Sequence, residues 1–400
     1  MQDYHEFCLA SRYGADKQWK SPKFQTAGDT MNDLICRRLK AAREKAGLTQ
    51  AELSEKLGFK DRQTLAAIEA GQRKISAEEL LRAIKVLALD LDYFTDSFQL
   101  AGEGRFSWRT QEGAPNKLLK EFEDKASRWI ATWRRLGELQ GAKTSALQPT
   151  LPLSERSSFE QAQAAAEKLV EEWKLGNVPA DSLESAIRKL GTLVLYVDPP
   201  QPISGAACQV PGANAILINR KEPEGRRHFD LAHELFHILT WEQMPPEHAE
   251  IVEFLYQGKG KQKRIEQLAN NFAAALLMPE RALLPRWQAR DGQEIHKRLN
   301  STASDFLVTA TALKWRLTNL GWLTKDDLLK INDAKLTFNG RLKDQQPLPG
   351  LFNAEFVKRL HTGLSKGQLS VRRAAEILDL TIEALAELFR ERKLSVPFDL

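Results

Sequence analysis

Hydrophobic residues recur at helical spacing along most of the 400-residue chain, and this pattern starts only after Met31. Between Asn32 and Phe94 the apolar residues form several short amphipathic segments that glycines interrupt. This pattern predicts a compact bundle of short helices. Residues 1–30 lack a sustained period, which leaves two interpretations open: a disordered tail, or a natural start at Met31.

The rest of the chain predicts further helices around one small sheet. A long amphipathic helix is expected at residues 116–139. Alternating apolar residues predict three strands, at Thr192–Val197, Ile203–Val210 and Ala213–Asn219. Pro211-Gly212 favours a tight turn that joins the last two strands into a hairpin. Helices are expected again up to Leu239, from Lys261 to Met278 and over most of the remaining chain. We therefore predict a mostly α-helical protein with one α+β domain.

The length of the chain, with 42% hydrophobic residues, exceeds what one ordinary core needs, so several folded units are expected. The predicted units are a tail at 1–30, a bundle of short helices at 31–97, a helical linker at 98–152, an α+β domain at 153–290 and a helical C-terminal region at 291–400. Within the last unit, residues 369–392 predict two helices joined by a turn. They lack a basic face, so we expect a packing or dimer-forming module there.

Composition narrows the class of protein. No apolar run reaches the roughly 18 to 20 residues of a membrane span, and no secretory signal opens the chain, so we expect a cytoplasmic protein without membrane contact. Three widely separated cysteines predict neither a disulfide framework nor a cysteine zinc knuckle. The net charge of +5 allows an anionic partner, but acids are interspersed with bases, so any nucleic-acid surface must be a local patch.

The candidate chemistry centres on an H-E-x-x-H motif inside a predicted helix, in which His233 and His237 lie four residues apart. This spacing puts both imidazoles on one helical face, so that both can bind one Zn²⁺ ion at about 2.0 to 2.1 Å. Zinc lowers the pKa of a bound water from about 15.7 toward roughly 7. Glu234 can then take the proton of that water, so the motif predicts zinc-dependent peptide hydrolysis with Glu234 as the general base.

A catalytic zinc site needs a third protein ligand, and Glu266 is the candidate on the next predicted helix. It borders an apolar stripe that runs through Ile265, Ala269, Phe272 and Leu276. A glutamate beside such a stripe is more often a solvated flank or the partner of an arginine. The residues by themselves therefore leave both roles of Glu266 open.

Together the two helices resemble the ImmA/IrrE family of zinc metallopeptidases. Residues Phe229 to His237 are similar to the family's aromatic-x-x-Ala-His-Glu-x-x-His helix, and Glu266 to Pro279 are similar to its Glu-x-x-Ala-Asn-x-Phe-Ala-Ala-x-Leu-Leu-Met-Pro helix. The resemblance implies a zincin-like domain in which His233, His237 and Glu266 bind zinc and Glu234 is the catalytic base. Two positions depart from the family pattern: Asp230 stands where threonine is frequent, and Phe236, where glycine is frequent, is expected to narrow the cleft.

The N-terminal bundle contains a second motif. Thr49 and Glu52 have the spacing of a helix-capping box, and the short helix that they start ends at Gly58. After a turn, a second helix is expected from Arg62 to Ala70. The run from Leu48 to Gly71 resembles the lambda-repressor-like (XRE) family of helix-turn-helix domains, with one extra residue in the turn. This resemblance implies binding to double-stranded DNA.

The residues expected to contact DNA are Gln50, Lys60, Arg62, Gln63, Thr64, Arg73 and Lys74. The first turn of the second helix can reach base edges, where arginine reads guanine and glutamine reads adenine bidentately. Lys60, Arg73 and Lys74 would contact phosphates. Acids nearly balance bases across the bundle, so a helical domain that docks onto a protein stays as the alternative.

The hairpin at residues 203–219, just before the predicted helix that contains the H-E-x-x-H motif, suggests a substrate site. A peptide can add a strand to an exposed sheet edge, and this hairpin is a candidate for that edge. An ordinary structural hairpin is the equal alternative.

These patterns predict a DNA-binding transcriptional regulator with a zinc metalloendopeptidase domain. The family resemblance implies that it cleaves a repressor-type partner protein. One alternative is a DNA-binding repressor whose zinc domain is inactive and serves as structure or sensor, and another is a peptidase whose N-terminal bundle docks onto a protein. A homodimer is compatible with each of these hypotheses.

Overall fold

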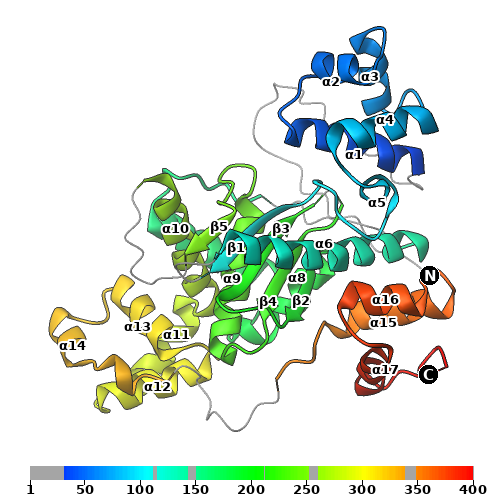
Figure 1. The fold of residues 1–400 in the computed structure, drawn as a ribbon. Coiled ribbons are helices and arrows are strands. Elements are labelled where there is room, and N and C mark those ends of the chain that lie inside the picture. Colours follow the sequence, from blue (N-terminus) through cyan, green and yellow to red (C-terminus); the bar gives the residue numbers. More distant parts are fainter. Residues whose placement is uncertain are drawn as a thin grey trace, which may run out of the picture.

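The computed structural model describes residues 31–110, 115–142, 150–210, 212–251, 260–337 and 348–399. The predicted tail at 1–30 and Pro211 of the predicted turn lie outside these ranges. Figure 1 shows a small helical domain set apart from a larger body, in which helices cover a central sheet. Among the described helices, none combines the length and the apolar character that a membrane crossing requires.

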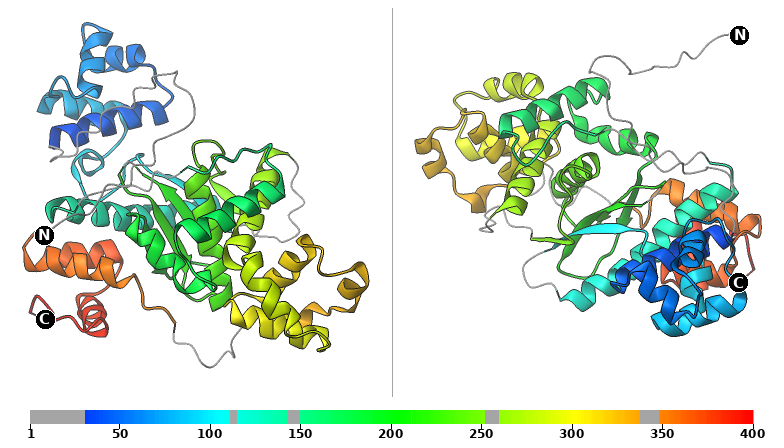
Figure 2. Two further views of the ribbon diagram at one scale, coloured as in Figure 1. Left: turned by 180° about the vertical axis from the view of Figure 1, so that it is seen from behind. Right: turned by 90° about the horizontal axis from the view of Figure 1, so that it is seen from above.

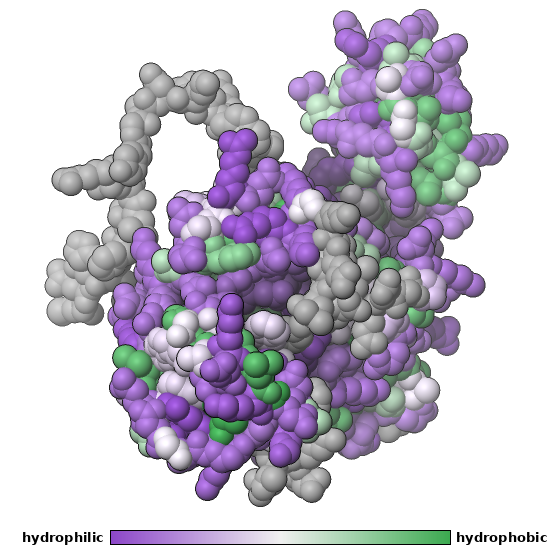
Figure 3. Space-filling view, turned by 90° about the vertical axis from the view of Figure 1, so that its left-hand side faces the viewer, coloured by the Kyte–Doolittle hydropathy of each residue, from purple (hydrophilic) through white to green (hydrophobic). Residues whose placement is uncertain are grey.

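The N-terminal domain is a bundle of short helices, as predicted. Its elements are α1 (Met31–Lys45), α2 (Gln50–Lys56), α3 (Arg62–Glu69), α4 (Ala77–Leu87) and α5 (Leu91–Thr95). They enclose a separate apolar core that includes Leu39, Leu53, Leu65, Ile68 and Phe94, each fully buried. This core shares no residue with the two cores of the larger body, and the domain forms the separate lobe of Figures 1 and 3. In Figure 3 the surface of the lobe is hydrophilic on one side and carries a hydrophobic patch on the other.

Local capping explains where α2 and α3 begin. The Thr49 hydroxyl accepts from the Glu52 amide at 3.2 Å, and a Glu52 carboxylate oxygen accepts from the Thr49 amide at 2.7 Å, which completes the predicted capping box. Asp61 caps α3, since its carboxylate accepts from the Thr64 amide at 2.8 Å. The turn thus ends on a capping acid directly before Arg62, so the first turn of α3 is fixed at the surface.

The central sheet is mixed and has five strands in the order β2-β4-β3-β1-β5. The strands are β1 (Arg105–Thr110), β2 (Leu193–Val197), β3 (Ile203–Gln209), β4 (Ala215–Asn219) and β5 (Ala249–Ile251). β2, β3 and β4 correspond to the three predicted strands, and β3 and β4 form the predicted antiparallel hairpin. The sequence patterns did not reveal β1 and β5.

Strand β1 corrects two expectations. It lies inside the segment 98–152, expected to be a helical linker, and it pairs with β3 from Arg105↔Gln209 to Thr110↔Ile203. The hairpin at 203–219 is therefore internal and cannot offer a free edge to a substrate, because β1 occupies that position. The edge strands are β2 and β5. The physical reason is a pairing between segments about a hundred residues apart, which alternation within one segment cannot reveal.

Apolar residues cover both faces of the sheet, since alternate side chains of each strand point to opposite sides. One face includes Val194, Ala207 and Ile216, which pack in a core with α7 (Phe159–Glu172), α8 (Leu183–Lys189), α9 (Glu224–Thr240) and α10 (Lys261–Leu277). The other face includes Leu195, Cys208 and Leu217, which pack with α6 (Asn116–Leu139) and the last helices of the chain. Figure 2 shows these helical layers on either side of the sheet.

The C-terminal region divides between the two cores. Helices α11 (Glu280–Gln288), α12 (Ile295–Asp305), α13 (Ala310–Asn319) and α14 (Lys325–Lys330) extend the core around α10. Helices α15 (Ala354–Ser365) and α16 (Val371–Leu378) pack on α6, where the Trp129 indole donates to the Ile377 carbonyl at 3.0 Å. Helix α17 (Ile382–Glu391) packs on α15 and α16. The exposed face of α17 carries Glu383, Glu387 and Glu391, which disfavours contact with DNA. Packing is thus the observed role of this region.

Candidate metal centre and nucleic-acid interface

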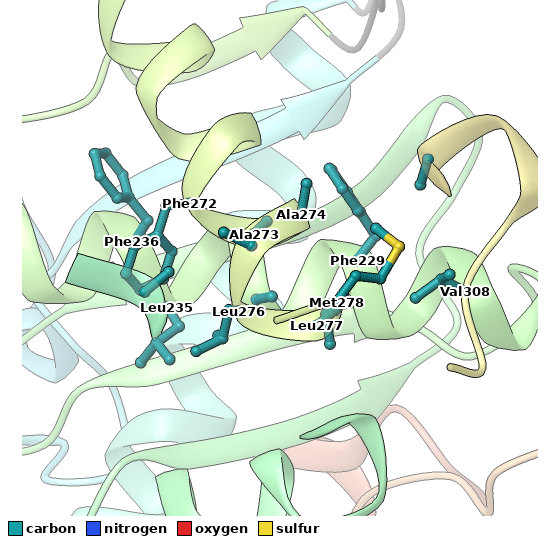
Figure 4. Packing of buried hydrophobic residues seen from close by; sticks show 14 of the residues in the cluster. Phe229, Leu235, Phe236, Phe272, Ala273, Ala274, Leu276, Leu277, Met278 and Val308 are labelled. Atoms are coloured by element: carbon teal, nitrogen blue, oxygen red, sulfur yellow. The ribbon is translucent and has the colours of Figure 1, made fainter. Parts of the chain in front are cut away.

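Helix α9 carries the H-E-x-x-H residues in the interior of the larger body. His233 and His237 are fully buried and Glu234 is 1% exposed. The helix begins after Pro223, and its apolar residues pack on α10 and on the sheet. Figure 4 shows this packing, in which Phe229, Leu235 and Phe236 of α9 lie beside residues of α10. The interlocked side chains fix the two helices against each other, so the position of α10 relative to the histidines is set by the core.

Phe236 belongs to this packing. It is fully buried, and its ring lies 5.5 Å from that of Phe272 on α10, centroid to centroid. Its ring also meets the His237 imidazole edge to face at 5.7 Å. Phe236 thus packs in the core between α9 and α10 and contacts the His237 ring, and its expected effect on the width of the cleft stays a prediction.

The structure brings His233, His237 and Glu266 together, with one ligand atom of each within 4.8 Å of the others. The Nε2 atoms of the two histidines are 3.0 Å apart. A Glu266 carboxylate oxygen lies 3.2 Å from Nε2 of His233, and the other lies 3.5 Å from Nε2 of His237. Donors around a tetrahedral zinc ion, at bond lengths of about 2.0–2.1 Å, are about 3.3 Å apart. The three side chains therefore fit as ligands of a single zinc ion.

Asn270 contacts one of these three side chains. Its side-chain oxygen lies 3.0 Å from Nδ1 of His233. Because an amide oxygen can only accept, Nδ1 carries the proton, and the lone pair of Nε2 is left to face the other two donors. Asn270 follows Glu266 by one helical turn, so one face of α10 supplies both groups. Sequence reasoning missed this role, although the four-residue spacing from Glu266 was a usable signal.

Replacing Asn270 with alanine is expected to weaken zinc binding by about 10- to 100-fold, because the His233 ring loses the acceptor that fixes its orientation and tautomer. The affinity can be measured by competition with a chromogenic chelator. Asn271→Ala is the matched control, since the Asn271 side chain contacts Gln163 and Asn319 instead of the histidine. Equal affinities for the Asn270 variant and the wild type would rule out this orienting role.

Comparison with known families agrees with the two-part organisation. Residues 39–94 match a helix-turn-helix family model, and residues 187–318 match the family model described as an IrrE N-terminal-like domain. Searches of curated proteins and of solved structures found no match. The chain therefore carries an XRE-like helix-turn-helix domain followed by an ImmA/IrrE-type domain, and the two matches support a DNA-binding regulator.

Most of the predicted DNA-contacting residues lie at the surface of the N-terminal domain. Lys60, Arg62, Gln63 and Lys74 are exposed, and Thr64 is partly exposed. Arg62 and Gln63 open α3, the second helix of the helix-turn-helix motif, whose N-terminal turn is the part that reaches base edges in such domains. This arrangement is compatible with base recognition by the first turn of α3.

Gln50 and Arg73 are held by acids within the same domain. The Gln50 amide donates to the Glu69 carboxylate at 2.8 Å. Arg73 forms a two-bond pair with Glu79, at 2.9 and 2.7 Å, and this pair raises the pKa of the Arg73 guanidinium. A phosphate contact by Arg73 must therefore compete with Glu79, so Lys60 and Lys74 are the more accessible cations for such a contact.

Proposed function

We propose that the chain is a DNA-binding regulator whose ImmA/IrrE-type domain is a zinc metalloendopeptidase. His233, His237 and Glu266 would hold the ion, and Asn270 would keep the His233 ring in place. The observation that carries this proposal is the spacing of the three ligand side chains, 3.0 to 3.5 Å between donor atoms of α9 and α10. A neutral imidazole pair with a carboxylate is a donor set typical of catalytic zinc.

Zinc bound there would supply Lewis acidity toward a water molecule and a peptide carbonyl. The protein's own part is proton transfer. Glu234 follows the first ligand on α9, and its buried carboxylate would take a proton from the attacking water. The same carboxylate would then deliver that proton to the leaving amine nitrogen. The surrounding core keeps bulk water away from this exchange, which strengthens the electrostatic interactions in the site.

The substrate that we propose is a repressor-type partner protein in the same cytoplasmic compartment. The fusion to a helix-turn-helix domain supports this choice, because DNA binding would bring the peptidase near other DNA-bound proteins. The test is to measure zinc in the purified protein and then to incubate it with the product of the neighbouring gene. One zinc per chain and two defined fragments of that partner are expected. A zinc-loaded protein that leaves such partners intact would favour the inactive, sensing domain instead.

The DNA-binding half makes a separate prediction. Arg62→Ala and Gln63→Ala are each expected to weaken binding to the preferred operator by about 1–3 kcal/mol, because each removes a candidate bidentate base contact. The operator would first be selected from random duplexes, and affinities would be measured over a range of salt concentrations. Arg390→Ala on α17, another exposed arginine, is the control. Absence of salt-dependent DNA binding by the wild type would favour the protein-docking alternative.

A further inference from the structure

Helix α9, which carries the proposed zinc ligands His233 and His237 and is called the metal helix below, contains a buried charge that the proposed chemistry does not use. Asp230 is fully buried and lies on α9 one turn before His233 and Glu234. An isolated buried carboxylate is strongly unfavourable, so its partners decide whether this part of the helix is stable. Two arginines meet it: Arg109 Nη1 lies 3.3 Å, and Arg226 Nε 3.4 Å, from the same carboxylate oxygen.

The two arginines differ in origin. Arg226 is on α9 itself, four residues before Asp230. Arg109 comes from β1, where Phe106 and Trp108 pack into the core on the α6 side of the sheet. By the alternation of a strand, Arg109 points to the opposite face, toward α9, and only 7% of it is exposed. The ion pair between Arg109 and Asp230 therefore connects the sheet to α9.

The strand that carries Arg109 is itself well fixed. β1 pairs with β3 on one side and β5 on the other, and Figure 2 shows it, in cyan, joined to the strands of the ImmA/IrrE-type domain. Residues 105–110 lie outside the region 187–318 that matches the family model. The segment expected to be a linker thus contributes a side chain to the support of the metal helix.

Arg109 contributes to the charge compensation around Asp230. A second acid lies nearby: Glu222 interacts electrostatically with Asp230 and with three arginines, Arg226, Arg109 and Arg227, and burial raises the pKa of its carboxyl. Removing Arg109 would take away one of the arginines that pair with Asp230, so less positive charge would offset its buried carboxylate. Because Asp230 precedes the first zinc ligand by only three residues, any shift of α9 that relieves this imbalance moves His233 and Glu234 as well.

We propose that Arg109 is a positioning residue of the metal centre. It lies outside the region that matches the family model, and by pairing with Asp230 it holds α9 in position against α10. This inference rests on the proposed zinc site. It assigns β1 to the peptidase unit, so the functional domain begins before residue 105. The pair also gives a physical partner to Asp230, the position that departs from the family pattern.

The test uses the full-length chain and zinc affinity measured by chelator competition. Arg109→Ala is expected to lower the affinity about tenfold or more, comparable to the loss of a residue that orients a ligand. Arg105→Ala is the matched control, since Arg105 lies on the same strand, is 61% exposed and pairs with Glu242 at the surface. This control should stay within twofold of the wild type. The double variant Arg109→Ala/Asp230→Thr, which removes both charges, should recover most of the affinity.

The melting temperatures of the metal-free proteins distinguish a role of Arg109 in positioning the zinc ligands from a role in stability alone. If Arg109→Ala does not fold, Arg109→Lys is measured instead. It keeps the charge without the guanidinium, and we expect it to lose zinc affinity as well, by a smaller factor. A variant that lowers the melting temperature of the metal-free protein but binds zinc as tightly as the wild type would overturn the inference and leave the proposed function standing. A wild type that binds no zinc would overturn both.

Discussion

Replacing Glu234 with glutamine is expected to slow partner cleavage by about 10²- to 10⁴-fold, the usual contribution of a positioned general base. Glutamine has nearly the same size and fits the same buried place on α9, but its amide cannot accept a proton from water at neutral pH. Because Glu234 is not among the three grouped ligand residues, zinc content should remain that of the wild type. A loss of rate at constant zinc is the expected signature of a base.

The measurement is the initial rate of fragment formation, made on protein samples whose zinc content has been determined in parallel. Glu242→Gln serves as the control, since Glu242 follows α9 closely but is 62% exposed at the surface. It should cleave at the wild-type rate. If Glu234→Gln retains full activity with its zinc, another group takes the proton and the role assigned to Glu234 is wrong.

Replacing Glu266 with alanine should have the largest effect on the metal itself. Removal of one of the three proposed protein donors should cost several kcal/mol of binding free energy, on the order of 10²- to 10³-fold in zinc affinity. The carboxylate also supplies the only negative charge among the three grouped ligands. Cleavage should disappear with the metal.

Zinc content after dialysis and affinity by chelator competition measure this loss. Gln267→Ala, the next residue on α10, is the control and should bind zinc like the wild type. Circular dichroism of both variants would show whether α10 still folds. Full zinc occupancy in a folded Glu266→Ala protein would contradict the ligand set and point to another donor.

Local patterns predicted much of this molecule. The bundle of short helices, the capping box at Thr49, the hairpin of β3 and β4 and the span of α6 all follow from residues close together in the chain. Capping, turn chemistry and helical period operate over a few residues, so a reading of short segments can find them. The H-E-x-x-H spacing on α9 indicated His233 and His237 as candidate ligands for the same reason, whereas the ligand role of Glu266 on α10 was implied by the resemblance to the ImmA/IrrE family.

Contacts between distant segments were missed. The run from Arg105 to Thr110 is too short to distinguish from a loop, and only its register with β3 makes it a strand. Asn270 was visible in the motif, but its contact with His233 depends on how α9 and α10 pack. Asp230 was noticed only as a departure from the family pattern. Its ion pair with Arg109 joins residues more than a hundred positions apart, so the sequence pattern could not reveal it.

Local sequence alone sets which donors the chain offers and which helical face carries them: two imidazoles one turn apart on α9, and a carboxylate and an amide one turn apart on α10. Tertiary packing decides that these faces meet, since the core around Phe236 and Phe272 brings α10 against α9. It also decides that β1, from the segment expected to be a linker, joins the sheet between β3 and β5. The physical reason is that helical period is a short-range property, whereas the meeting of two surfaces depends on the burial of apolar area from the whole chain.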